Sequence, residues 1–229
     1  MNKEIYVKVT NDGPYLVYGI PKIEQKIIEA DEHGISIRYG NGKTFEIKSD
    51  PSALCRCGKS QNAPFCDSTH IKVKFKGKET TGFEPILDGA EEFDGPNLTL
   101  ADNQDFCAYA RFCDAKGSIW KLIFEGTKES DDQTVKEANN CPSGRLLLFN
   151  KEGKPVEHDL SQSIAAIEDR GLGISGPLWI QGKIRVESED GQSYEIRNRQ
   201  TLCRCGASAR KPFCSGSHAS VEFKAHYPK

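Results

Sequence analysis

Alternating apolar and polar residues occur in two similar segments of the chain and predict two sets of short β-strands. Residues 13–19 read Gly-Pro-Tyr-Leu-Val-Tyr-Gly, and residues 176–182 read Gly-Pro-Leu-Trp-Ile-Gln-Gly. Each segment leads through a polar turn to an aromatic-Glu-Ile triplet, at 45–47 and 194–196, and the flanks at 71–76 and 220–224 alternate as well. A period of two residues is typical of half-buried strands. We therefore expect two related β-modules, each too small to bury much core alone.

The two copies differ in length, because the first has about fifteen extra residues after Gly19, spanning 20–34. We expect these residues to break the symmetry of an otherwise twofold pair. Duplicated small units commonly bury complementary strand faces against each other. The sequence therefore predicts a monomer whose two modules form an intramolecular pseudo-dimer.

The pattern changes between about residues 79 and 160 and predicts a separate middle domain. The apolar runs at 118–124 and 145–149 predict strands. The acidic segment from Ser130 to Asn140 predicts one short helix, capped at Ser130 or Asp131 and ended by Cys141-Pro142. We accordingly assign residues 1–78 to a first module, 79–160 to a middle domain and 161–229 to a second module. The expected fold class is α+β and rich in β-structure.

A repeated set of metal-binding side chains lies within the two modules. Each copy offers three cysteines and one histidine, and every residue of the second set follows its counterpart by 148 positions. Three soft thiolates with one imidazole suit an iron–sulfur cluster or zinc. The two sets are Cys55, Cys57, Cys66 and His70, and Cys203, Cys205, Cys214 and His218.

The spacing within each set predicts two pairs of ligands. Residues two apart in an extended segment project to the same side, as Cys55 and Cys57 would. Residues four apart lie one helical turn apart, as Cys66 and His70 would. Two pairs can serve two metal atoms, with the imidazole on the atom that the helical pair holds. Asp67 and Ser215 stand where a helix cap is expected.

Bulk composition excludes several classes of function. The 229 residues include 31 basic and 33 acidic side chains, so no large field would attract nucleic acid or an anionic membrane. No apolar run approaches the roughly 20 residues of a spanning helix, and the first residues lack an apolar signal core. Nine cysteines in a chain without a signal favour a reducing compartment and metal ligation, so we expect a cytoplasmic protein. No Ser-His-Asp or paired-carboxylate arrangement is evident, so we expect no enzymatic activity.

The first ligand set reads Cys-x-Cys-x₂-Ser-x₃-Pro-x-Cys-Asp-x₂-His, which resembles the CDGSH (NEET) iron–sulfur family. The first copy has Ser68 where glycine is usual, and the second has Ser215 in place of the aspartate. The resemblance implies that each set of four binds one [2Fe-2S] cluster. It implies electron transfer, with redox partner proteins, or redox and pH sensing or cluster donation to apoproteins. Structural zinc in an interaction module is the alternative, although zinc sites usually pair their cysteines at Cys-x₂₋₄-Cys.

Three further cysteines, Cys107, Cys113 and Cys141, lie in the middle domain. Cys-x₅-Cys followed by a distant Cys-Pro resembles a bacterial ferredoxin in which Ala110 replaces the central cysteine. The resemblance implies a divergent ferredoxin-like domain with one [3Fe-4S] cluster, and a cysteine at position 110 would supply the missing ligand. A [4Fe-4S] cluster completed by solvent or a non-cysteine ligand is the alternative, as are three ordinary buried cysteines.

Overall fold

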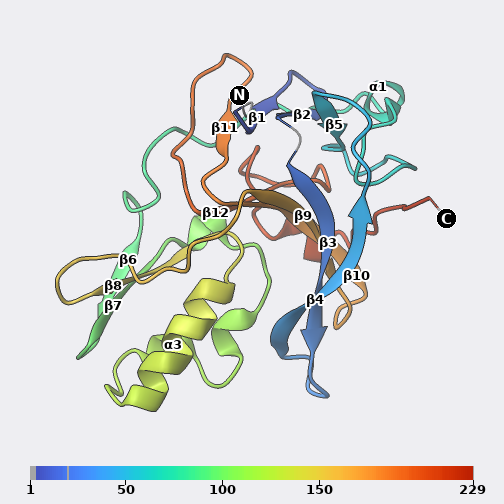
Figure 1. Ribbon diagram of the computed structural model, residues 1–229. Helices are drawn as coiled ribbons and strands as arrows, with labels where there is room; N and C mark the ends of the chain where they lie inside the picture. The colour runs from blue at the N-terminus through green and yellow to red at the C-terminus, as the bar shows by residue number, and fades with distance from the viewer. Residues whose placement is uncertain (1–3, 20, 229) are drawn as a thin grey trace.

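Within residues 4–19 and 21–228, which the computed structural model describes, the chain forms three β-sheets (Figure 1). The first sheet has the strand order β11 (Arg185–Glu187), β1 (Tyr6–Val9), β2 (Tyr15–Tyr18) and β5 (Ser52–Leu54). The second has the order β12 (Arg199–Leu202), β10 (Ile174–Gln181), β9 (Ser163–Asp169), β3 (Lys22–Ala30) and β4 (Ser36–Phe45). The third belongs to the middle domain and consists of β6 (Glu91–Asp94), β7 (Leu98–Asp102) and β8 (Leu146–Asn150).

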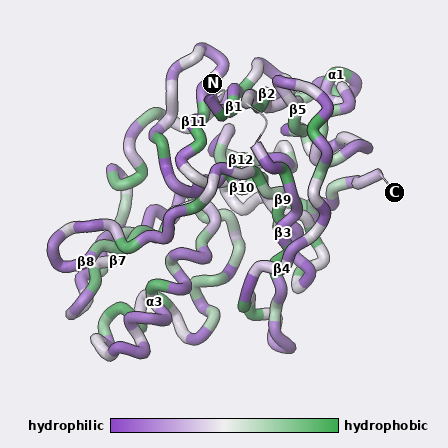
Figure 2. Tube along the Cα trace, viewed as in Figure 1, coloured by the Kyte–Doolittle hydropathy of each residue, from purple (hydrophilic) through white to green (hydrophobic). Residues whose placement is uncertain are grey.

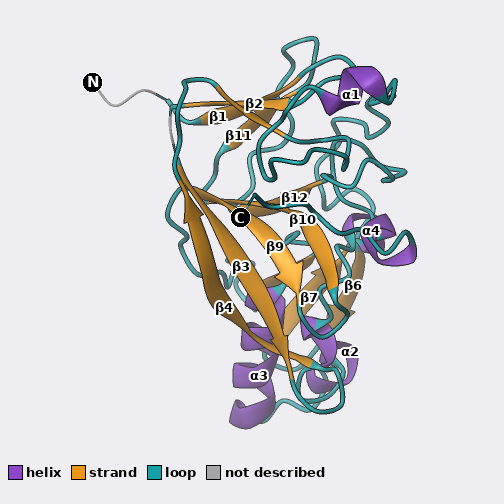
Figure 3. Cartoon of the chain, turned by 90° about the vertical axis from the view of Figure 1, so that its right-hand side faces the viewer, coloured by secondary structure: helices purple, strands orange, loops and turns teal. Residues whose placement is uncertain are grey.

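Short helices lie between these strands. The α-helices are α1 (Thr69–Lys72), α2 (Ile119–Leu122), α3 (Lys128–Asn140) and α4 (Ser217–Ser220), and the 3₁₀ turns are η1 (Gln104–Phe106) and η2 (Phe112–Asp114). Figure 3 shows the first sheet at one end of the molecule, the long strands of the second sheet in the middle, and α2 and α3 at the opposite end. The α+β, β-rich class expected from the sequence is therefore confirmed.

The two modules exchange strands in a reciprocal way. β1 of the first module pairs in parallel with β11 of the second, with Val7 opposite Val186. β3 of the first module pairs in parallel with β9 of the second, with Ile23 opposite Ile164. Because β3 follows β2 as β11 follows β10, the two pairings are related by a pseudo-twofold exchange. The expected intramolecular pairing of the modules is thus present in the structure.

The extra residues of the first module lengthen this exchange and do not break it. Ile20 lies outside the described residues, but residues 22–30 form β3, which pairs with β9 over seven residues and with β4 on its other side. The corresponding second-module strand, β11, has three residues. The insertion therefore breaks the symmetry, as expected, because it makes β3 longer than its counterpart and extends it into a hairpin with β4.

One hydrophobic cluster joins both modules. It contains residues from the first module, such as Val7 and Tyr15, and from the second, such as Ile164, Leu178 and Val186, all with essentially no exposed area. Burying an aliphatic or aromatic side chain of this size contributes about 1.5–3 kcal/mol. The core that neither module could build alone therefore forms between them.

The middle domain packs α3 against its own sheet. The helix begins at Lys128, after Thr127, whose hydroxyl accepts a hydrogen bond from the Ser130 amide in a capping box. The predicted helix is confirmed, but it starts two residues earlier than Ser130, and its cap is Thr127, so the prediction of Ser130 or Asp131 as the cap was wrong. Most of α3 has the colour of hydrophilic residues in Figure 2, as its sequence predicts. Residues 145–149 form β8 as predicted, shifted by one position.

The segment at 118–124 is helical, so its prediction as a strand was wrong. Ile119, Leu122 and Ile123 are buried at a helical spacing in α2 and its last turn, and the Trp120 indole donates to Asp102. A run of apolar residues this short does not distinguish a buried strand from a buried helical turn.

The flanks at 71–76 and 220–224 were also predicted as strands, and both are instead a helical turn followed by a loop. The turn closes because the Phe75 amide donates to the His70 carbonyl, as Phe223 donates to His218. Lys74 and Glu222 each adopt a positive φ at the same place in this loop. No helix in the described part of the chain combines the length and apolarity that crossing a bilayer requires.

Candidate metal centres

The first ligand set is assembled from the end of β5, one loop and α1. Cys55 follows β5 directly, and its sulfur lies 3.7 Å from that of Cys57. The Cys66 sulfur lies 3.3 Å from Nδ1 of His70, which is on the first turn of α1. The predicted pairing of residues two apart and four apart is therefore present.

The second set repeats this geometry. The sulfurs of Cys203 and Cys205 are 3.7 Å apart, and the Cys214 sulfur lies 3.4 Å from Nδ1 of His218 on α4. The donors of each module thus stand as two pairs of the same dimensions. Among the residues that the structure describes, no three Cys, His, Asp or Glu side chains are placed to share one metal ion.

The same hydrogen bonds hold both loops. The amides of Cys55 and Cys203 donate to the carbonyls of Pro64 and Pro212, and the amides of Cys66 and Cys214 donate back to Ala53 and Thr201. Ser60 and Ser208 each donate a hydroxyl proton to the carbonyl of the phenylalanine that precedes the third cysteine. These bonds tie the third cysteine to the strand that carries the first two, which fixes the two pairs relative to each other.

Asp67 and Ser215 hold the loop and do not occupy the cap position that was predicted for them. The N-cap residues are Ser68 and Gly216, both in the left-handed conformation, with no side-chain cap. Asp67 accepts from the amides of Gln61 and Thr69, and Ser215 accepts from the amide of Ala209, the counterpart of Gln61. Burial opposes ionisation of Asp67, but these hydrogen bonds lower its pKa to about 2.

Each tight cysteine pair favours one thiolate near neutral pH. The hydrogen bond from Cys57 lowers the pKa of Cys55 to about 6, against the effect of burial, and Cys205 does the same for Cys203. The amide of Ser68 donates to the Cys66 sulfur, and that of Gly216 to the Cys214 sulfur. A deprotonated thiol is the form that binds metal. The donor set is therefore chemically suited to soft metal ions.

The two ligand loops meet back to back on the pseudo-twofold axis. A Cβ at Gly58 would lie 2.4 Å from the Cys205 carbonyl oxygen, and one at Gly206 would lie 2.7 Å from that of Cys57. Both glycines also have positive φ, which other residues adopt at a cost. Only glycine therefore allows the two loops to approach this closely.

Tyr15 and two arginines, none of which was predicted from the sequence, support the ligand loops. Tyr15 is fully buried and donates its hydroxyl proton to the carbonyls of Cys203 and Pro212 in the opposite module. Arg56 donates to the Thr10 carbonyl, and Arg204 binds the carbonyls of Gly176 and Ile167. The repeated Cys-Arg-Cys triplet was the available signal, since an arginine between two ligands is found in both copies.

The middle cysteines come from three elements that converge next to the third sheet. Cys107 follows η1, Cys113 is in η2 and Cys141 caps the C-terminus of α3. Burial, then the charge of Asp114 and that of Cys141, raises the pKa of Cys113 to about 12, and Cys107 adds to the effect. Cys107 and Cys141 therefore both lie within electrostatic reach of Cys113.

Two residues near the middle cysteines change the expectation for a fourth ligand. The Cys113 thiol lies 3.7 Å from the Asp114 carboxylate, which is exposed and adjacent in sequence. Ala110, in contrast, packs in a hydrophobic cluster with Phe112 of its own loop and Ile167 and Trp179 of the second sheet. A side chain at position 110 is thus committed to the core, which the cysteine spacing did not indicate.

Comparison with protein families agrees with these sites. The family described as iron-binding zinc finger CDGSH type matches residues 12–71 and 175–219, and the family described as divergent 4Fe-4S mono-cluster matches residues 93–151. The chain carries two CDGSH-type modules around a divergent mono-cluster domain. The matched spans contain all eleven predicted ligands, so this is an iron–sulfur protein. Comparisons with curated proteins and with solved structures gave no match.

The CDGSH-type spans lie inside the first and second modules, and the mono-cluster span lies inside the middle domain. The boundaries at residues 78 and 160 stay predictions. They divide a structure in which the two CDGSH modules share both of their sheets.

Proposed function

We propose that this chain is a non-enzymatic electron-transfer protein with three clusters. Cys55, Cys57, Cys66 and His70 would hold one [2Fe-2S] cluster, and their four counterparts in the second module would hold another. The main support for this proposal is that the two ligand sets have the same geometry. The paired sulfurs are 3.7 Å apart in both modules, and the distance from the third sulfur to the imidazole nitrogen is 3.3 Å in the first module and 3.4 Å in the second. When bound, such a cluster supplies reversible one-electron chemistry.

Several features of the protein suit a dinuclear cluster at each site. The donors stand in two pairs, which provides two ligands for each of two iron atoms. Amide protons donate to Cys66, Cys214 and Cys205 at 3.4–3.5 Å, and such hydrogen bonds to sulfur influence reduction potential. The back-to-back loops place both sites on rigid elements close to each other, as an electron relay needs.

The middle cysteines would hold the third cluster. Three thiolates support [3Fe-4S], whereas the description of the matching family names a 4Fe-4S cluster. For the four-iron form, the Asp114 carboxylate beside Cys113 is the nearest non-cysteine candidate as a fourth ligand. Arg145 adds a buried positive charge near this site, held by two hydrogen bonds to Asp102, and would offset the charge of the thiolates.

The expected partners are redox proteins, in the cytoplasm. A cleft of about 590 Å³ opens over Cys57 and Cys205, and its lining includes Lys59, Lys74 and Lys224. Such a basic cleft between the two CDGSH ligand loops favours a partner with an acidic docking surface.

Cluster donation or sensing is the second candidate, and the exposure of the first module favours it. His70 and Cys66 are partly exposed, whereas His218 and Cys214 are buried. An accessible imidazole ligand can be protonated or replaced more easily, which suits the release of a cluster to an apoprotein.

The experiment that tests the proposal is quantification of iron, sulfide and zinc in the isolated protein, followed by redox titration monitored by EPR. We expect two [2Fe-2S] signals on reduction, a separate signal from the middle site, and reversible one-electron steps without loss of iron. A colourless protein that contains zinc would contradict every proposed function that depends on an iron–sulfur cluster. Rapid transfer of iron and sulfide to an apo-acceptor, with irreversible reduction, would favour the carrier function.

A further inference from the structure

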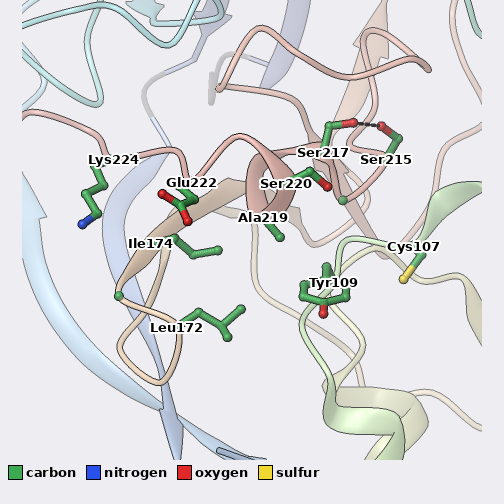
Figure 4. A pocket seen from close by; sticks show the side chains of 12 residues that line it. Cys107, Tyr109, Leu172, Ile174, Ser215, Ser217, Ala219, Ser220, Glu222 and Lys224 are labelled. Atoms are coloured by element: carbon green, nitrogen blue, oxygen red, sulfur yellow. Dashed lines mark hydrogen bonds between the residues drawn. The ribbon is translucent and has the colours of Figure 1, made fainter.

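The residues that precede two ligands in different domains touch each other. Phe106 precedes Cys107 of the middle domain, Phe213 precedes Cys214 of the second module, and their ring centroids are 5.5 Å apart in an edge contact. Beside them, a Cβ on Gly216 would lie 3.1 Å from the Cys107 carbonyl oxygen and 3.4 Å from the Tyr109 side chain. Figure 4 shows Cys107 and Tyr109 facing the segment from Ser215 to Ser220 across a hollow of about 650 Å³.

Charged side chains reinforce this junction. The buried guanidinium of Arg197 lies over the ring of Phe106 at 4.8 Å and over that of Phe213 at 5.1 Å, and it donates to the Ser143 carbonyl. Arg210 of the second module forms an ion pair of 2.8 Å with Asp105. The ligand loops of the two domains are thus in direct contact.

The corresponding residues of the first module face elsewhere. Phe65, the counterpart of Phe213, has its edge contact with Phe45 of β4 at 6.2 Å. Ser68, the counterpart of Gly216, is exposed, and the amide of this residue donates to Cys66 as that of Gly216 donates to Cys214. The two modules are alike in their ligands but differ in what covers them.

We propose that the middle site exchanges electrons directly with the second module through this junction, and that the first module is reached through the second by the Gly58–Gly206 contact. This order of sites rests on the proposed function. The exchange is a single electron, lost at one site and gained at the next, and no bond or proton is transferred. Gly216 is a positioning residue, because its missing side chain lets the Cys107 segment approach Cys214.

The two copies supply a matched pair of substitutions. Gly216→Ser gives the second module the residue that the first module has at the equivalent position, Ser68. Both positions have a left-handed backbone, with φ of +75° at Gly216 and +67° at Ser68. The backbone conformation is therefore compatible with serine, but the new Cβ must displace the Cys107 carbonyl. Ser68→Gly is the reciprocal control. Phe213→Leu, with Phe65→Leu as its control, tests the same junction through the ring contact.

The experiment measures electron-spin relaxation of the two [2Fe-2S] signals in the fully reduced holoprotein, where all three clusters are paramagnetic. His70→Cys and His218→Cys assign the signals, because each replacement shifts the spectrum of its own module. The two adjoining [2Fe-2S] sites should enhance each other's relaxation, and the contribution of the middle site is the part that is lost in Cys113→Ala, which removes a ligand of that site. We expect this contribution in the signal of the second module alone. Gly216→Ser and Phe213→Leu should reduce this contribution, whereas their controls should leave it unchanged.

A contribution of the middle site to the relaxation of the first module, of both modules equally or of neither would overturn the proposed order of sites. An unchanged contribution in both Gly216→Ser and Phe213→Leu would overturn the role of the junction. Iron counting by Mössbauer spectroscopy on the same samples distinguishes a failure of the proposed function from a failure of the proposed order of sites. Absence of a middle cluster contradicts the proposed function itself, while three clusters with the wrong signal enhanced contradict only the route between them.

Discussion

At the scale of single residues, the buried side chain of Tyr15 in the first module holds the ligand loop of the second module. Tyr15 bonds to the carbonyls of Cys203 and Pro212, which flank the second ligand loop at its first and third cysteines. Leu178 occupies the matching strand position in the second module and carries no hydroxyl. This support at the residue scale is therefore present in one direction only.

Tyr15→Phe should lower the free energy of unfolding of the holoprotein by about 1–3 kcal/mol, because it removes the buried hydrogen bond to the Cys203 carbonyl. The Pro212 carbonyl keeps the hydrogen bond from the Cys203 amide. Urea unfolding at equal iron content measures this change. Tyr18→Phe is the control, since Tyr18 is partly exposed and its ring keeps the stack on Tyr6 at 4.5 Å. Equal effects of the two substitutions would show that the hydroxyl of Tyr15 contributes little.

A second prediction at this scale concerns the nuclearity of the middle cluster. Asp114→Cys should supply a fourth thiolate next to Cys113 and convert a three-iron centre to a four-iron one. Ala110→Cys should not, because position 110 is packed against the second sheet. EPR and iron content under reducing, iron-rich conditions measure the conversion. Conversion in Ala110→Cys and not in Asp114→Cys would restore the expectation drawn from the cysteine spacing.

At the scale of elements, α1 and α4 present the two candidate histidine ligands in different surroundings. α1 contains no buried residue, whereas His218 on α4 is 4% exposed. Burial, followed by the positive charge of Arg204, lowers the pKa of His218 to about 4. A histidine with a lowered pKa resists protonation between this value and its usual range near 6.5. Acid therefore has easier access to the first ligand set than to the second.

On a shift to mildly acidic pH, the visible absorbance should decay in two phases, with the first module losing its cluster faster. His70→Cys should slow the fast phase, and His218→Cys should act on the slow phase alone. Protonation of the imidazole competes with metal binding, so both phases should accelerate as the pH falls. A single phase, or a fast phase that His218→Cys removes, would contradict the prediction.

At the scale of the whole molecule, Arg199 of β12 attaches the middle domain to the second module. Its guanidinium donates to the carbonyls of Ala138, Cys141 and Leu146 and pairs with Glu157 at 2.6 Å, and the side chain is 2% exposed. One side chain thus binds the end of α3, the loop of a candidate ligand and the start of β8.

Arg199→Met should destabilise the protein by about 3–5 kcal/mol, because it breaks a buried charge pair and leaves several acceptors unpaired. Urea unfolding measures the loss, and limited proteolysis should show faster cleavage of the middle domain. Arg185→Met is the control: Arg185 pairs with Glu187 and Glu4 at the edge of the first sheet, so its loss should cost about 1 kcal/mol or less. Equal stability of the two variants would contradict this role of Arg199.

The sequence by itself determined the duplication, the fold class and the pairing of the candidate ligands. Metal ligation depends on short spacings, and residues two or four apart meet in a strand or a helical turn almost regardless of their surroundings. This is why the paired geometry around Cys55 and His70 was predictable. The helix at 128–140 was also predicted, because a run of polar, helix-compatible residues is a local signal, but its first residue and its cap were placed too late.

The tertiary structure alone decided how the sites are covered and connected. The helical turn at 119–122, the strand exchange between modules, the packing of Ala110 and the reach of Tyr15 to Cys203 all depend on partners far away in the chain. The same holds for the contact between Gly216 and Cys107, which distinguishes two otherwise matching ligand sets. A local pattern specifies which side chains can bind a metal. Long-range packing decides which of the two ligand loops contacts the middle domain.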